Sequence, residues 1–201
     1  MFRRHELDRD SLDFWRRQRR AAQRGRGGRG FPYGGRSPAT IALIVLLFLG
    51  LILPGSLLQA VASLPLAPVW LALLSSILPG GLLGLIFVGL FVWIMGSQLE
   101  PLDTAWKYIA LFFVSGTLGA LAGDQLAGGL VGSVAAFGLA GGYAYVMWAH
   151  SHMDQAGVWR WVIGLLVLNA VLSGLQPAAL VSMFAAFVAG FAFAYVTKFG
   201  G

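Results

Sequence analysis

His150, His152 and Asp154 form a short cluster of side chains that could do chemistry, in a segment that reads His-Ser-His-Met-Asp. Imidazole and carboxylate groups are ligands that several divalent metal ions accept. Glu100 and Asp103 are further carboxylates that could face this segment across the same surface. No local spacing enforces a common metal site, however, and histidines in surface loops are common. We therefore expect no bound metal and no cofactor.

Polar side chains are rare inside the apolar segments that make up most of the chain. The main ones are Ser115, Thr117, Ser133 and Asn169. Proton and ion pathways through apolar surroundings need connected polar or ionisable groups. These four residues do not form a visible relay, so we do not expect a transporter or a channel.

Six long apolar runs must position these side chains. They lie at residues 39–53, 81–96, 106–122, 128–148, 158–172 and 177–196. A helix needs about 17–25 apolar residues to cross a hydrocarbon layer of about 30 Å. Several runs are at or below the lower limit, so we expect the helices to extend into flanking residues. The pattern predicts an all-α, polytopic membrane protein with six transmembrane helices.

The composition indicates the same class. Charged residues make up 11% of the chain and hydrophobic residues 58%, against usual values of about 25% and about 45–50%. Too few polar residues remain to cover a soluble domain. The absence of cysteine excludes disulfide bonds and thiolate metal sites. We expect a cytoplasmic, partly disordered Arg/Gly-rich tail at 1–38 and a six-helix membrane domain at 39–201.

The basic residues predict the orientation. Eleven of the fourteen lie in the first 36 positions, and all eleven are arginine. By the positive-inside rule, this places the N-terminus in the cytoplasm, and six spans return the C-terminus to the same side. Lys107, Arg160 and Lys198 then also fall on the cytoplasmic side, whereas the outward gaps, such as 56–69, contain no basic residue. We expect a multi-pass protein of a bacterial cell membrane.

The tail itself has two parts. Residues 10–20 (DSLDFWRRQRR) combine early acids, late arginines and two aromatic side chains, which is typical of a helix lying on an anionic membrane surface. Residues 24–30 (RGRGGRG) are glycine-rich and should be flexible. An RGG-like stretch can bind RNA, but beside a first membrane span we favour lipid anchoring and expect no nucleic acid partner. The run at 39–53 should be an uncleaved anchor, because 38 mostly polar residues precede it.

Small residues recur four positions apart within the apolar runs. The series are Ser115, Gly119 and Gly123; Gly128 and Gly132; Gly138 and Gly142; and Ala186, Gly190 and Ala194. This spacing lets helix backbones approach closely, and close packing is what holds helices together in lipid. We expect a compact bundle with the glycine-rich fourth run at its centre.

The fourth run contains the sequence VGSVAAFGL at residues 131–139. It resembles the nucleophile segment of the rhomboid intramembrane serine proteases, in which a Gly-x-Ser-Gly element precedes a Phe-Gly-Leu-like packing stretch. Placing Phe137 and Gly138 on that stretch puts Ser133, which follows Gly132, at the nucleophile position. Valines replace the glycines that stand two before and one after the serine in the family.

Flanking segments carry the same resemblance. Residues 70–78, which begin with Trp70, look like the tryptophan-led approach to the second span of rhomboids. Gly96 and Glu100 match the Gly-x-x-x-Glu ending of that span. The resemblance covers about residues 40–197 and implies a six-helix rhomboid-like fold.

The resemblance also implies a base for Ser133, because a serine hydroxyl needs one to act as a nucleophile. In rhomboids this base is a histidine in the sixth span, ahead of a glycine-rich stretch. Placing Ala186 and Gly190 on that stretch puts Met183 at the histidine position. The nearest histidine in the chain, His150, lies seventeen residues after Ser133. That separation is about 25 Å along a helix, against the ~3 Å that proton transfer needs.

The donors for the developing negative charge are also missing. Rhomboids use a histidine and an asparagine of the second span for this purpose. Counting back from Glu100, these positions fall on Gly84 and Val88, which have no side-chain donor. We expect Ser133 to serve as a small residue that bonds a neighbouring helix or its own i−4 carbonyl.

These features predict a rhomboid-like pseudoprotease that binds or stabilises transmembrane helices of a partner protein, in contact with membrane lipids. Two alternatives remain open. One is an active intramembrane serine protease with Ser133 as nucleophile and an unconventional base. The other is a fixed structural subunit of a larger membrane complex.

Overall fold

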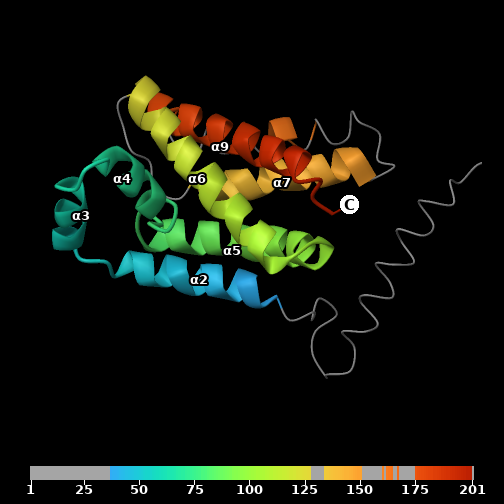
Figure 1. Ribbon diagram of the computed structural model, residues 1–201, viewed down its shortest axis with the longest axis horizontal. Helices are drawn as coiled ribbons and strands as arrows, with labels where there is room; N and C mark the ends of the chain where they lie inside the picture. Colours follow the sequence, from blue (N-terminus) through green and yellow to red (C-terminus); the bar gives the residue numbers. More distant parts are fainter. Residues whose placement is uncertain are drawn as a thin grey trace, which may run out of the picture.

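The computed structural model describes residues 37–127, 134–150, 160, 162–164, 167 and 175–200. Within these residues all regular structure is helical. The helices, drawn in Figure 1, are α2 (Pro38–Leu51), α3 (Gly55–Ala62), α4 (Ala67–Ser75), α5 (Leu82–Leu99), the short 3₁₀ turn η2 (Glu100–Leu102), α6 (Ala105–Ala127), α7 (Ala135–His150) and α9 (Pro177–Val196).

Helices α5, α6 and α9 are each long and apolar enough to cross a membrane. A fourth candidate arises if α2 and α3, which are bent by 94° at their break, count as one broken span. The chain is therefore all-helical with three to four candidate spans among the described residues. The fifth predicted run, 158–172, lies mostly outside them.

The expected extension of the runs into flanking residues is confirmed for two helices. The run 81–96 becomes an 18-residue helix that continues to Leu99, and the run 106–122 becomes a 23-residue helix that continues to Ala127. The sixth run is α9 without change, and it begins with a proline in its first turn, where the missing N–H costs no hydrogen bond.

Helices α6, α7 and α9 form the centre of the bundle. The first turn of α6 contacts the end of α9 through Lys107 and Thr197. The last part of α6 contacts the start of α9, where Gly123 lies against Ser182. These two helices are therefore antiparallel, as Figure 1 shows.

Helix α7 runs parallel to α9. Gly138 in α7 contacts Gly190 in α9, and two turns later the ring of Tyr145 packs edge-on against Tyr195 at 6.1 Å between centroids. All residues from 134 to 142 are buried. The prediction that the glycine-rich fourth run is central is thus confirmed for its described part.

The small residues spaced four apart lie at contacts between helices, as the sequence predicts. A methyl group at Gly119 would lie 2.6 Å from the Cβ of Ala186. A methyl group at Gly138 would overlap the Ser115 hydroxyl, and one at Gly190 would overlap the Gly138 carbonyl. The backbones of α6, α7 and α9 therefore touch where the glycines are.

Helix α2 lies beside α5 and forms a second layer with it (Figure 1). Between them, the interval 56–69, expected as an outward gap, forms most of α3 and the start of α4. Helix α4 packs on α6 rather than projecting away from the bundle. The start of α2, the turn from α5 to α6 and the residues after α9 meet at one end of the bundle. We call this the charged end, formed by residues 37–40, 100–107 and 197–200.

Candidate functional site

The predicted nucleophile segment, residues 131–139, is described only from residue 134 onward. Ser133 and Gly132 lie outside the described residues. The structure resumes at Val134, which is 1% exposed, and enters α7 at Ala135. Phe137, one of the motif residues, stacks on Phe91 of α5 with 6.2 Å between ring centroids.

Met183 lies close to this segment. Val134 and Phe137 of the nucleophile segment form a buried cluster with Ala186, and Met183 packs against it. The remaining side chains of the cluster come from α4 and α6: Ala72, Ala120 and Leu121. The structure thus brings the position assigned to the base close to the residue that follows Ser133. Met183 itself cannot serve as the base, because a thioether does not accept a proton as an imidazole does.

At both positions assigned to charge-stabilising donors, other atoms of the protein pack closely. A Cβ at Gly84 would overlap the carbonyl of Pro79, so the backbone itself fills the space of a side chain there. Val88 is 9% exposed and belongs to the larger apolar core, a different cluster from that of Met183. Neither position offers a donor.

Ser182 is a polar residue that the sequence analysis missed. It is fully buried, and among the described residues its hydroxyl has no hydrogen-bond partner. It lies against Gly123 at the contact of α9 with α6. Its position four residues before Ala186 extends the small-residue series by one member, and this spacing is the signal that could have identified it.

Glu100 forms the best-defined polar contact of the structure. Its carboxylate accepts hydrogen bonds from the N–H of Ala39 and of Thr40, both at 2.9 Å, and from the Thr40 hydroxyl at 2.8 Å. Glu100 is 8% exposed. The free N–H groups and the positive end of the dipole at a helix start favour a carboxylate there. Glu100 therefore caps α2 from a distant part of the chain.

Gly96 makes room for this contact. A Cβ at Gly96 would overlap the hydroxyls of both Thr40 and Tyr108. The Gly-x-x-x-Glu motif thus has a structural explanation, with the glycine admitting the threonine that the glutamate binds. Trp70, the other flanking motif residue, lies on α4 and is 47% exposed.

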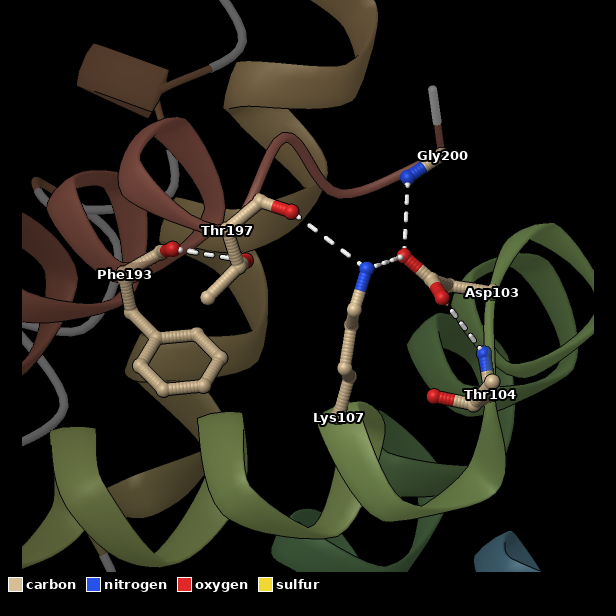
Figure 2. A network of polar contacts seen from close by, with 6 residues as sticks. All are labelled: Asp103, Thr104, Lys107, Phe193, Thr197 and Gly200. Atoms are coloured by element: carbon tan, nitrogen blue, oxygen red, sulfur yellow. Dashed lines mark hydrogen bonds and ion pairs between the residues drawn. The ribbon is translucent and has the colours of Figure 1, made fainter.

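A second polar network joins the turn before α6 to the residues after α9 (Figure 2). Lys107 Nζ donates to Asp103 Oδ2 at 2.8 Å and to the Thr197 carbonyl at 3.3 Å. Asp103 also accepts the N–H of Thr104 at 2.7 Å and of Gly200 at 3.3 Å. This network ties the C-terminal residues to the charged end.

The network shifts the acidity of Asp103. Partial burial raises the pKa of its carboxyl, but the hydrogen bonds from Lys107, Thr104 and Gly200 and the charge of Lys107 together outweigh burial. The pKa of Asp103 consequently lies below its ordinary value of 3.8. The carboxylate is charged at neutral pH and serves as an anchor rather than a proton donor.

The remaining candidates are the acidic and histidine side chains that could bind a metal ion. Where the structure describes the chain, no three His, Asp or Glu side chains gather closely enough to hold a metal ion. His152 and Asp154 lie outside that part. Asp124, near the end of α6, is hydrogen-bonded to the neighbouring Gln125.

Comparisons with known proteins add no assignment: no family model, no curated protein and no solved structure matches this chain.

Proposed function

We propose that this chain is a six-span, rhomboid-like membrane protein without peptidase activity, and that it binds or stabilises a transmembrane helix of a partner protein. The observation that carries the proposal is the apolar cluster around Met183. Met183, at the position where the resemblance puts a catalytic base, packs against the buried cluster that contains Val134.

The packing of α5 supports the loss of hydrolysis. The backbone of Pro79 takes the space that a donor side chain at position 84 would need. Restoring a donor there would require the segment before α5 to move. An enzyme of this class also needs a base, and the thioether of Met183, at the position that the resemblance assigns to the base, cannot act as one.

The exposed apolar face of α5 is the surface that a partner helix or lipid would contact. Helix α5 directs a series of large apolar side chains outward: Leu82, Leu83, Ile86, Phe87, Leu90, Trp93 and Ile94. In lipid, a partner helix is held by packing against such a face and not by the hydrophobic effect. The Arg-rich tail would hold the cytoplasmic side of the protein on anionic lipid.

The absence of catalysis is tested by reacting the purified, reconstituted protein with a fluorophosphonate probe, beside a Ser133→Ala variant. We expect no covalent label in a sample whose folding is verified by cooperative unfolding. Labelling that disappears in the Ser133→Ala variant would show an activated serine and a working protease.

Helix binding is tested by placing a photo-crosslinking residue at Leu90, on the exposed face of α5, and irradiating native membranes. The same residue at Val196, on α9, is the control for non-specific capture. We expect a membrane-spanning partner linked preferentially from position 90. If the linked protein instead belongs to a complex that never exchanges with added free chain, the chain is a fixed structural subunit. Purification as a stable monomer with no partner linked would contradict the proposal.

A further inference from the structure

The exposed indole and phenol side chains of the three central helices lie at one end of the bundle. Trp106 is in the first turn of α6, Trp148 in the last turn of α7 and Tyr195 in the last turn of α9. Their exposed fractions are 72%, 44% and 59%. Because α6 is antiparallel to α9 and α7 is parallel to it, all three turns lie at the charged end (Figure 1). We call these three residues the aromatic rim.

The opposite ends of α6 and α9 have a different composition. Leu126, close to the end of α6, is 77% exposed, and Leu175, shortly before α9, is 63% exposed. Residues 121–127 and 175–180 contain no tryptophan or tyrosine. Tryptophan and tyrosine favour the headgroup level of a membrane, because they combine an apolar ring with a polar group. The charged end therefore has the side chains of an interfacial surface, and the opposite ends of α6 and α9 lack them.

Buried rings support the aromatic rim from below. Tyr145 of α7 is 8% exposed and packs edge-on against Tyr195 and Phe191, with 6.1 and 5.7 Å between ring centroids. Trp148 lies 6.4 Å from Tyr145 and 6.1 Å from Phe191 by the same measure. Such aromatic pairs contribute stability beyond the area that they bury. The exposed rings of α7 and α9 are thus held together in one packed surface.

The acidic side chains of the charged end are already bound within the protein. The carboxylate of Glu100 is buried against the start of α2, and that of Asp103 is paired with Lys107. Lys198, three residues after Tyr195, is exposed. In the part of the chain that the structure describes, no carboxylate pairs with Lys198. Its charge is therefore available to a ligand outside the bundle.

A second exposed base lies on the same flank of the bundle. Arg160 is exposed, and Val162, two residues later, belongs to a buried cluster to which α7 contributes Ala144 and against which Phe191 of α9 packs. Phe191 also contacts Trp148 of the aromatic rim. Two cations thus accompany the exposed rings of α7 and α9.

We infer that Trp148, Tyr195, Lys198 and Arg160 form a binding surface for anionic phospholipid headgroups. The rings lie at the headgroup level, and the two cations bind the phosphates. Anionic lipid is the occupant because the exposed charges are positive, the acids of this end are bound internally, and rings of this kind favour the membrane interface. This surface belongs to the folded bundle. It is independent of the Arg-rich tail, of the loss of peptidase activity and of helix binding.

The test replaces Tyr195 with the photo-crosslinking residue p-benzoylphenylalanine in the full chain. The protein is reconstituted in vesicles of equal parts phosphatidylglycerol and phosphatidylcholine and irradiated, and mass spectrometry measures the ratio of phosphatidylglycerol to phosphatidylcholine adducts. The same residue at Leu126, exposed near the opposite end of α6, is the reference. Both leaflets have the same composition, so the direction of insertion does not affect the comparison.

We expect the adduct ratio at position 195 to be roughly five-fold higher than at position 126, since one cation at an anionic membrane surface has about this effect. Combining Arg160→Gln with Lys198→Gln should lower the ratio to that at position 126, whereas Lys198→Arg should preserve it. Both substituted side chains are exposed, and cooperative unfolding verifies the fold of each variant.

Three results would overturn the inference. Equal ratios at positions 195 and 126 would show that the surface does not select anionic lipid. A high ratio that persists in the Arg160→Gln/Lys198→Gln variant would assign the selection to the Arg-rich tail. A cross-link from position 195 to a second copy of the chain, in place of lipid, would make this surface a protein interface.

Discussion

At the scale of single residues, Glu100 makes the clearest prediction. Replacing it with alanine leaves the N–H groups of Ala39 and Thr40 and the Thr40 hydroxyl without their acceptor in a buried place. Because unsatisfied buried donors are costly, we expect Glu100→Ala to lower the free energy of unfolding by roughly 2–3 kcal/mol. Glu100→Gln should cost less, since an amide oxygen still accepts. Denaturation in mixed micelles measures both, with Asp124→Asn as the control. Equal stability of Glu100→Ala and the parent chain would contradict the capping role.

Met183 gives a second prediction at this scale. Introducing a histidine at this position should not produce fluorophosphonate labelling of Ser133. The imidazole would enter an apolar cluster, and Gly84 would still lack a donor because Pro79 fills its space. Labelling is measured in reconstituted protein beside a Met183→Leu control. A labelled Met183→His variant would show that the base alone had been missing.

At the scale of helices, the contact of α7 with α9 depends on Gly190. A methyl group there overlaps the Gly138 carbonyl, so Gly190→Ala must push two backbones apart. We expect a loss of about 1–3 kcal/mol of stability, the usual cost of overpacking. The matched control is Gly89→Ala in α5, where a Cβ meets nothing within 4 Å. That change should leave stability equal or raise it by up to about 1 kcal/mol, since alanine favours a helix over glycine. Similar effects of the two substitutions would contradict the close packing.

The helices also show how far sequence reasoning reaches. The small residues four apart were sufficient to predict a compact bundle with the fourth run at its centre, and the structure shows that α6, α7 and α9 touch at Gly119, Gly138 and Gly190. They were not sufficient to identify α3 and α4 as helices, because the interval 56–69 has no charge pattern and is interrupted by Pro65 and Pro68. The residues after α4 also pack against glycines of three other helices, with Ser76 at Gly116, Ile77 at Gly50 and Pro79 at Gly84, and no local pattern reveals such contacts.

At the scale of the whole molecule, the charged end joins helices that are far apart in the sequence. The Asp103 network should make the protein sensitive to acid. Because the pKa of Asp103 is depressed in the folded state, its contribution to stability is complete above the ordinary value of 3.8 that it has in the unfolded chain. That contribution is lost as the pH falls through the lower folded value. We expect the parent chain to lose more stability than Asp103→Asn between pH 5 and pH 3. Thermal unfolding across this range measures the difference, and identical profiles would contradict the network.

The sequence by itself determined that this protein is apolar, helical and built from closely packed spans, because these properties follow from composition and short-range spacing. It also determined that Met183, Gly84 and Val88 cannot act as base or donors, because side-chain chemistry does not depend on the fold. Only the tertiary structure decided that Glu100 caps a helix sixty residues earlier and that Met183 packs close to Val134. Such contacts arise when distant helices pack together, and the free energy of that packing is a property of the whole bundle.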